Sequence, residues 1–591
     1  MARRAASVYS RAVTDEGTRQ EDPEASGRLL FALALLAGAL LRLVLLGQPD
    51  LFGADEGRWA IGARNLVEGG LAQAVALSDR PLGPPAGTPL LLPALLSVMV
   101  RIFGAEEWAI RLPSAFAGLV GAFLLERIVR RGWGQPAGHL AGAFAALLPP
   151  LVSASRVATV EPSLVALGLA GVIFGLRAFE EDLPLEGALS GFFFGLGFLA
   201  KGYAVLLYMA PLLLALAARP RLFSLGRTKR SLALLVLVFL VVGGGQLFAV
   251  AFLRTELFGF QLATLFGASE AAVRVAAEPT AFGADLKSLV STLFFFLPLA
   301  GVGLAFLRRP VGEAEIESGA TDGDRRVDHG ALWGAFLVAL LSLVAVAGKL
   351  KLSSIPVLPV VAALAGLGGT AILRLSPDPA RRRREAIAAA AAGVVVLAAS
   401  AFFVASPVDP LFGGRARPVD VTAALLAIAG VAGLAAMLVF GAFRRVLKGR
   451  LALVFLSGLL VAGGIESVRA IRFALLTHRT GAREVAEQIA PLVAPARPEA
   501  LSFRGGEREA LEFRLFRTGA SWEAVATPEA FSLENGAGTV RSWIWPDGAP
   551  AGALAPPAAV REAIAASLRD VSAEVSARAG RPTGLHVFVR R

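Results

Sequence analysis

The stretch LLFALALLAGALLRLVLL covers residues 29–46, and LFGADEGRW follows at residues 51–59. The first stretch matches the 17–25 apolar residues, roughly, that a helix needs to cross a bilayer. Residues 1–28 before it are polar and contain five arginines. Such a tail is long for the charged region of a signal peptide, and no clean cleavage site follows. We therefore predict an uncleaved first membrane helix.

Apolar blocks of this length recur along the whole chain of 591 residues, which is 55% hydrophobic with a mean hydropathy of +0.64. This composition is too apolar for a soluble protein and predicts an all-α polytopic membrane protein with about thirteen spans. The expected spans are 29–47, 111–129, 139–155, 162–178, 185–200, 202–218, 231–253, 288–307, 331–347, 355–373, 387–405, 421–441 and 451–467.

The net charge of +12 does not indicate a nucleic-acid partner, because the basic residues occupy short loops between apolar blocks. The chain contains no cysteine, which excludes disulfides and thiolate metal sites. Its four histidines are scattered and lack the spacing of metal ligands.

The basic clusters also predict the orientation in the membrane. They all fall on one side of the alternating spans, which is the cytoplasmic side by the positive-inside rule. The clusters are the N-terminal tail, Arg127 with Arg130 and Arg131, Arg219–Arg230, Arg308 and Arg309 with Arg325 and Arg326, Arg374 with Arg381–Arg384, and Arg444–Arg450. Only the loop Glu180-Glu181-Asp182 is acidic on that side, and acidic residues count little in the rule. We expect a cytoplasmic N-terminus and an outside C-terminus.

Three regions follow from this layout. Residues 1–28 form a cytoplasmic tail and 29–467 a membrane domain, with outside loops at about 48–110 and 254–287. The apolar run 89–104 is expected to lie on the membrane rather than cross it, since crossing would break the charge alternation.

Residues 468–591 form a small α/β domain outside the cytoplasm. Its helix patterns are Ala482–Leu492 and Ala558–Val575, and its strand-like runs are Thr539–Trp545 and Leu585–Val589.

Asp55 and Glu56 are the leading candidates for chemistry. Two adjacent carboxylates next to hydrocarbon are costly, and intramembrane or juxtamembrane charges of this kind commonly mark a functional site. The alternative is structural, because the pair could begin a helix over 57–69 as N-cap and first-turn acid.

Other charged residues lie at the same, outward ends of the predicted spans. They are Arg58, Arg156, Glu161, Lys201, Glu270, Arg274, Lys349 and Lys351. A carboxylate can take a proton from an acceptor hydroxyl, and cations can hold a phosphate leaving group. Structural alternatives stay open: the lysines could only snorkel to the interface, Glu270 and Arg274 could be a helix pair, and Arg156 could pair with Glu161.

At these residues the chain resembles the GT-C membrane glycosyltransferases, and within them the bacterial aminoarabinose-transferase and protein O-mannosyltransferase-like family. The resemblance is carried, in family order over roughly 30–370, by Asp55–Gly70, Phe103-Gly104 with Arg111–Ala115, Arg156–Glu161, Leu199–Gly202 and Gly348–Lys351 with Pro359. It implies a GT-C helical bundle in the bacterial inner membrane. It also implies inverting transfer of a sugar from a polyprenyl-phosphate donor, expected to be undecaprenyl phosphate, to a lipid, glycan or protein acceptor.

The resemblance gives Asp55 the catalytic position with Glu56 beside it. It places Arg58, Lys201, Lys349, Lys351 and Arg274 near the lipid phosphate. A lysine of the family is missing from Ala86–Pro89, where Arg80 could substitute, and Glu161 stands where aspartate is usual. No cofactor is required, although outside carboxylates could hold a weakly bound divalent metal ion.

Two other classes of function remain open from the sequence. A multispan transporter or flippase of a lipid-linked substrate would use the same cations but would not need Asp55. A non-catalytic homologue would account for the missing lysine.

Overall fold

A computed structural model shows a mostly helical chain. It describes residues 23–48, 56, 59, 60, 62, 63, 66, 67, 91–104, 106–218, 226–253, 293, 296–307, 329–338, 355–373, 450–477, 500–501, 542–546, 568–573 and 585–590.

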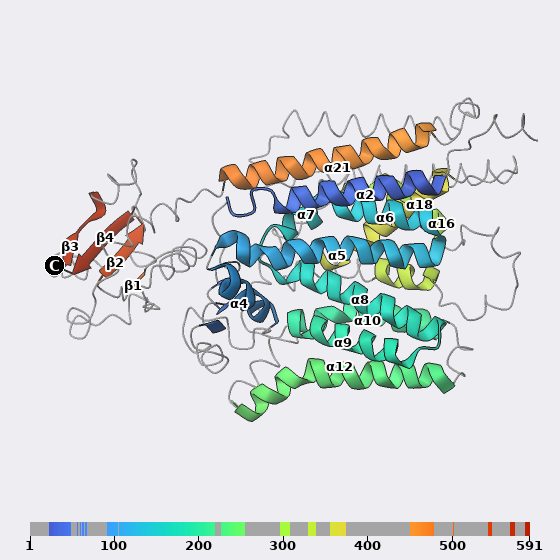
Figure 1. Cartoon of the computed structure of the whole chain (residues 1–591), viewed down its shortest axis with the longest axis horizontal. Coiled ribbons are helices and arrows are strands. Elements are labelled where there is room, and N and C mark those ends of the chain that lie inside the picture. The colour runs from blue at the N-terminus through green and yellow to red at the C-terminus, as the bar shows by residue number, and fades with distance from the viewer. Residues whose placement is uncertain are drawn as a thin grey trace, which may run out of the picture.

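Within these residues, helices lie side by side in a bundle and four strands form one sheet near the C-terminus (Figure 1). The bundle elements are α2 (Pro23–Leu43), α4 (Leu91–Phe103), α5 (Glu107–Trp133), α6 (Gln135–Leu147), α7 (Pro149–Ser155), α8 (Val160–Glu180), α9 (Pro184–Lys201), η2 (Gly202–Val205), α10 (Leu206–Ala217), α12 (Gly226–Leu253), α16 (Leu297–Phe306), η5 (Ile355–Val357), α18 (Pro359–Leu373) and α21 (Arg450–Thr477). A further short helix covers His329–Val338.

Four helical stretches of the described chain are long and apolar enough to cross a membrane, and α6 with α7 would make a fifth. The four are Glu107–Trp133, Val160–Glu180, Pro184–Ala217 and Thr228–Gly245. This establishes a multi-pass membrane protein. The predicted count of about thirteen spans covers many residues outside the described ranges and stays a prediction.

The stretch Pro184–Ala217 contains a reversal, so α9 and α10 run in opposite directions beside α8. At 34 residues, one straight helix would be about 51 Å long, well beyond a bilayer core of about 30 Å. Gly202 at the break has φ +57°, a conformation that glycine adopts without a Cβ clash. After it, Tyr208 packs at Gly168 and Leu212 at Gly175, so α10 runs in the direction of α8. The boundary predicted between 185–200 and 202–218 coincides with this reversal, and the crossing of the membrane by each arm stays a prediction.

Helix α9 packs backbone to backbone against α12 through glycines four residues apart. A methyl group built on Gly187 would lie 2.4 Å from the carbonyl oxygen of Ser231, and one on Gly191 would lie 2.2 Å from that of Leu235. Small residues at this spacing let two membrane helices approach closely where lipid provides no hydrophobic driving force. The glycines therefore fix α12 along α9.

The span predicted at 139–155 is bent by 56° between α6 and α7. Pro150 has no N–H for the carbonyl of Ala146, four residues earlier, so the helix ladder is interrupted there. The carbonyl accepts a hydrogen bond from Nη1 of Arg42 in α2 (2.6 Å), and Ser467 Oγ of α21 bonds the next carbonyl, Leu147 (3.3 Å). Side chains of two other helices thus satisfy backbone groups that the membrane core would leave unpaired.

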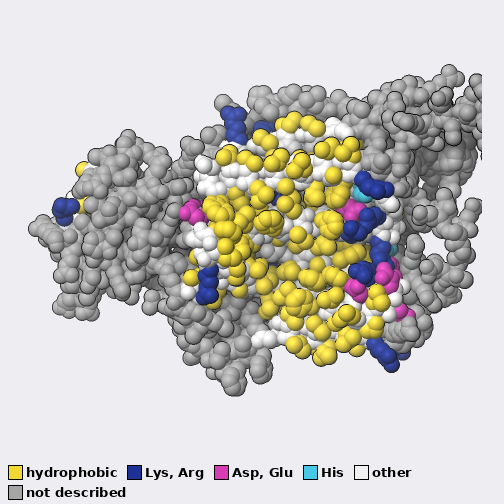
Figure 2. Space-filling model, viewed as in Figure 1, with side chains coloured by type: hydrophobic (Ala, Val, Ile, Leu, Met, Phe, Trp, Pro, Cys, Tyr) yellow, Lys and Arg dark blue, Asp and Glu magenta, His cyan; other side chains and the backbone are white. Residues whose placement is uncertain are grey.

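The outer face of the bundle is apolar. Figure 2 shows a broad band of hydrophobic side chains over the helices, with charged side chains at its edges. On α2 the exposed residues Leu29, Leu33, Leu36 and Leu40 recur every three to four positions, which puts them on one lipid-facing stripe. Helix α4 has 13 residues, about 20 Å, and is too short to cross a bilayer alone. The expected surface position of 89–104 stays a prediction.

The C-terminal sheet has the strand order β1-β2-β4-β3, with β1 at Ala500–Leu501, β2 at Ser542–Pro546, β3 at Leu568–Asp570 and β4 at Leu585–Arg590. Strands β1 and β2 are parallel, and β4 runs antiparallel to β2 and β3, pairing Ser542 with Val589. The predicted strands at Thr539–Trp545 and Leu585–Val589 are confirmed within the described residues. The helix predicted over Ala558–Val575 is wrong at β3, whose backbone pairs with β4 instead.

Candidate functional site

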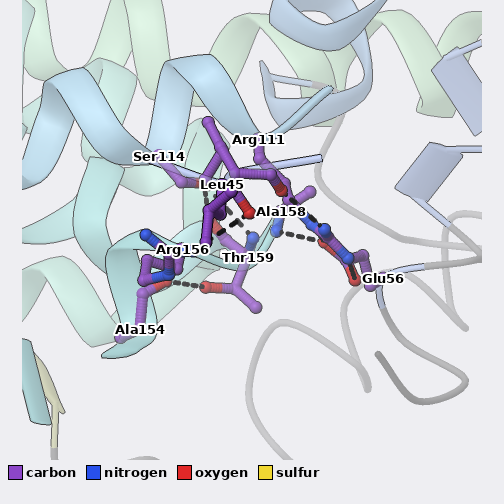
Figure 3. A network of polar contacts seen from close by, with 9 residues as sticks. Leu45, Glu56, Arg111, Ser114, Ala154, Arg156, Ala158 and Thr159 are labelled. Carbon is purple, nitrogen blue, oxygen red and sulfur yellow. Dashed lines mark hydrogen bonds and ion pairs between the residues drawn. The ribbon is translucent and has the colours of Figure 1, made fainter. Parts of the chain in front are cut away.

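Glu56 lies at the centre of a buried polar network at one end of the bundle (Figure 3). Its Oε1 accepts a hydrogen bond from Nε of Arg111 at 2.7 Å, and Oε2 accepts one from Nη2 at 2.8 Å. The backbone N–H of Ala158 also donates to Oε1, at 2.8 Å. A two-point contact between a guanidinium and a carboxylate is strong and fixes the relative orientation of both groups.

Arg111 joins this carboxylate to the first membrane helix. Its Nη1 donates to the carbonyl oxygen of Leu46, just beyond α2, at 2.8 Å. Leu46, Glu56, Arg111 and Ala158 come from the end of α2, the following loop, the start of α5 and the turn between α7 and α8. The Glu56–Arg111 pair therefore ties these four segments together, with Leu46 bonded to the guanidinium and Ala158 to the carboxylate.

Arg156 holds the end of α2 from the other side (Figure 3). Its Nη1 donates to the carbonyls of Leu41 (2.5 Å) and Val44 (2.8 Å), and its Nη2 to that of Leu45 (3.2 Å). The last carbonyls of a helix have no intrahelical partner, and a cation is favourable there. Burial, together with the positive charge of Arg111, lowers the pKa of Arg156 to about 10, so it stays protonated at neutral pH. The described contacts of Arg156 are thus with backbone rather than with Glu161.

Glu161 instead pairs with Lys201. The Nζ atom of Lys201, the last residue of α9, lies 2.5 Å from Oε1 of Glu161 in the first turn of α8. Both side chains are partly exposed. The pair joins two helix ends on the same end of the bundle as Glu56, which we call the site end.

Tyr208 anchors a further segment, η5, at the site end. This buried side chain of α10 donates its hydroxyl to the carbonyl of Pro356 in η5. The contact fixes the backbone just before α18. Lys349 and Lys351 precede Pro356 in the sequence.

Four predicted site residues are therefore placed: Glu56, Arg156, Glu161 and Lys201 lie at the site end. The remaining candidates, Asp55, Arg58, Arg80, Glu270, Arg274, Lys349 and Lys351, lie outside the described residues. Across the ranges that are described, no group of three or more metal-binding side chains occurs.

Arg111 is the residue that the choice of candidates omitted. It is 1% exposed, and it belongs to a stretch that carries the family resemblance. The sequence did contain a signal for Arg111, because arginine at the beginning of an apolar span is rare unless it has a partner.

The fold and the site define a class of protein, namely a multi-pass helical membrane protein that gathers ionised side chains at one end of its bundle. Residues 87–243 match the family model described as dolichyl-phosphate-mannose-protein mannosyltransferase. A segment of 85 residues is 34% identical to YycA of Bacillus subtilis (strain 168), a protein provisionally named a mannosyltransferase. That segment is 14% of this chain and 12% of YycA, so the chain matches only a small part of this relative.

The chain is also similar to two crystal structures of ArnT from Cupriavidus metallidurans. The apo structure is 19% identical with a TM-score of 0.55, and the structure bound to undecaprenyl phosphate is 20% identical with a TM-score of 0.56. Each covers 95% of this chain and 97% of ArnT. These likenesses establish an ArnT-like GT-C fold, and together with the family model they confirm the predicted resemblance to membrane glycosyltransferases.

Proposed function

We propose that this protein is an inverting glycosyltransferase that moves a sugar from a polyprenyl-phosphate donor to an acceptor hydroxyl or phosphate. The observation that carries this proposal is the buried Glu56–Arg111 pair, which anchors the loop bearing Asp55 among the helix ends at the site end. The fold and the family match support the same reaction. The ArnT structure with undecaprenyl phosphate favours that lipid as the carrier.

The reaction requires one base and one cationic site. Asp55 takes the proton from the acceptor oxygen, which attacks the anomeric carbon of the sugar. The bond from that carbon to the phosphate oxygen breaks on the opposite face, and polyprenyl phosphate leaves with the bonding electron pair. Lys201 is the described cation best placed to contact this phosphate, since it is partly exposed at a helix end. Arg58, Arg274, Lys349 and Lys351 are proposed to share the role.

Glu56 and Arg156 receive positioning roles in this proposal. Both carboxylate oxygens of Glu56 are engaged by Arg111, and the described contacts of Arg156 are with three helix-end carbonyls. Held in this way, Glu56 orients its neighbour Asp55, and Arg156 fixes the helix end from which the loop departs. Precise placement of a reacting group contributes a large part of many enzymatic rate enhancements.

We extend the proposal to the topology. The N-terminus lies in the cytoplasm, about thirteen spans follow within 29–467, and the site end faces the periplasm. Residues 468–591 form a periplasmic domain. A reporter enzyme that is active only outside the cytoplasm should be active when it is fused after Arg591. An inactive fusion, together with activity of a reporter that works only in the cytoplasm, would contradict this orientation.

The reaction is tested by transfer from radiolabelled polyprenyl-phosphate sugars in membranes that contain the full chain. Asp55→Asn removes the base and keeps the shape of the side chain. We expect transfer to fall about 10²- to 10⁴-fold, the usual contribution of a general base.

Asp50→Asn is the matched control, because it removes the same charge from the same loop five residues earlier. It should retain transfer. Equal transfer by Asp55→Asn and the wild type would exclude the catalytic role of Asp55. Movement of the labelled lipid across the vesicle membrane, without any transfer of its sugar, would instead support a transporter.

A further inference from the structure

One apolar stripe on the outer face of α5 ends in a charged residue. The exposed side chains of Phe116, Val120 and Phe123 are spaced by three to four residues, so they lie on one face of the helix. Arg127 is the next residue on that face and is 48% exposed. We call these four residues the Phe116–Arg127 surface. Helix α5 runs from the site end to the opposite end of the bundle, where α8 also finishes (Figure 1).

The Arg127 side chain folds back along this stripe. Its Cζ atom lies 5.0 Å from the ring centroid of Phe123, one turn nearer the middle of the predicted span. A long cationic side chain near the end of a membrane helix usually reaches away from the hydrocarbon toward water. Arg127 instead covers an aromatic ring, whose face attracts a cation. Its hydrogen-bond donors therefore lie beside the upper end of the apolar stripe.

The charge of Arg127 is only partly balanced. In the part of the chain that the structure describes, Glu126 is the carboxylate that it contacts, with Nε 3.5 Å from Oε2. The same buried carboxylate also pairs with Nη1 of Arg130 at 3.2 Å. Two guanidiniums thus share one carboxylate, which leaves one positive charge on the group. The contacts of Arg127 use its Nε and the face of its guanidinium, so both terminal nitrogens face a further acceptor.

Arg177, near the end of α8, shows the balanced case. It is 39% exposed, and its Nη2 lies 2.7 Å from Glu186 while its Nε lies 3.8 Å from Glu181. Here one guanidinium contacts two carboxylates. The two arginines are similarly exposed at the same end of the bundle and differ in their acidic partners. Charge complementarity therefore favours Arg127 over Arg177 as a contact for an anion.

We propose that the Phe116–Arg127 surface binds one anionic phospholipid. Arg127 holds the phosphodiester, to which a guanidinium donates two parallel hydrogen bonds, and an acyl chain follows the apolar stripe. From Arg127 to Phe116 the helix rises about 17 Å, close to one leaflet of a core of about 30 Å. This length fits the acyl chain of a phospholipid and is much shorter than an undecaprenyl chain. The proposal goes beyond the proposed reaction and uses none of its residues.

The test compares phosphatidylglycerol with phosphatidylcholine of identical acyl chains, so that the two lipids differ only in the headgroup. The full chain in detergent is titrated with an equimolar mixture, and native mass spectrometry counts each lipid that stays bound. We expect the first bound lipid to be phosphatidylglycerol with a preference of about fivefold, since one basic residue near a membrane surface is worth about that factor.

Two variants locate the bound lipid. Arg127→Gln should remove most of the preference. Phe123→Leu keeps the stripe apolar but removes the ring under the guanidinium, and it should lower the preference about twofold. Arg177→Gln is the matched control, because it makes the same change in a similarly exposed arginine, and it should keep the preference. Thermal unfolding of each variant in phosphatidylcholine checks that it is folded.

Equal binding of the two phospholipids by the wild type would overturn the proposal. An equal loss of preference in Arg127→Gln and Arg177→Gln would also overturn it, because the effect would then belong to the net charge of that end. Displacement of phosphatidylglycerol by an equimolar amount of undecaprenyl phosphate would assign the surface to the carrier lipid instead. A lipid-free dimer in the same spectra that Arg127→Gln abolishes would make the surface an interface between copies of this chain.

Discussion

The two ends of the helical bundle use the same residue types in different ways. At the site end, Glu56 and Arg111 are 0% and 1% exposed and bond to backbone groups of other segments as well as to each other. At the opposite end, where α5 and α8 finish, Arg131 bonds Glu180 and Glu181. Arg131 is 26% exposed and Glu181 42% exposed, whereas Glu180 is 6% exposed.

The comparison separates ion pairs that position the backbone from ion pairs that only neutralise charge. Buried ions that also hold carbonyls and N–H groups fix the backbone, because each lost contact would leave a buried group without a partner. Ion pairs at the water interface mostly cancel charge and contribute little. The acidic loop Glu180-Glu181-Asp182, which runs against the charge pattern of its side, is explained by this second use. Arg131 neutralises its first two carboxylates, and Arg177 binds Glu186 beyond the loop at 2.7 Å.

Arg111→Met should have the largest effect, because it leaves the Glu56 carboxylate buried without its cation. Removal of one partner from a buried pair costs about 3–5 kcal/mol. We expect a large fall in the melting temperature of the purified protein and no measurable transfer. Thermal unfolding in detergent and the membrane transfer assay measure the two effects.

The double variant Glu56→Met and Arg111→Met tells positioning apart from simple stability. Replacement of both charges by apolar side chains is often neutral for stability. Stability should therefore return in part while transfer stays absent, since Asp55 is no longer oriented. Recovery of transfer together with stability would show that the pair does not position the loop.

Lys201→Gln should have a smaller effect, because its pair with Glu161 is partly exposed. Loss of the ammonium leaves a carboxylate that water can still reach, and we expect a cost of about 1–2 kcal/mol. The proposed phosphate contact predicts a higher KM for the donor. Glu161→Gln is the control, because it breaks the same pair but keeps the cation. If the two variants raise KM equally, Lys201 does not bind the phosphate.

Much of the helical layout could be predicted from hydropathy, since a helix satisfies its backbone hydrogen bonds internally where lipid offers no partners. The predicted spans at 111–129, 162–178 and 231–253 coincide with α5, α8 and α12 within a few residues at most ends. The bend at Pro149 and Pro150 was not predicted. The mean hydropathy of a sequence window does not register a lost backbone hydrogen bond. The bend arises from such a loss, because proline has no N–H to donate.

The partners of the site residues were less predictable than their location. The sequence places Arg156, Glu161 and Lys201 at one end because loop charge and span direction determine which end each residue occupies. It does not determine that Glu161 bonds Lys201 or that Arg156 bonds the end of α2. Those contacts join residues 40 and more than 110 positions apart. Their geometry comes from the packing of helices, which hydropathy does not encode.

Glu181→Gln at the opposite end should have the smallest effect and provides the strictest check of the comparison. The substitution breaks contacts with two arginines, Arg131 and Arg177, more ion pairs than Lys201→Gln breaks, so a simple count of salt bridges predicts the reverse order. Because water reaches all three of these side chains, we expect a loss below about 1 kcal/mol and unchanged transfer. Raising the salt concentration should shrink the loss further, since exposed pairs are screened. A fall in stability or transfer comparable to that of Arg111→Met would mean that the opposite end also positions the helices, and the distinction between the two ends would be lost.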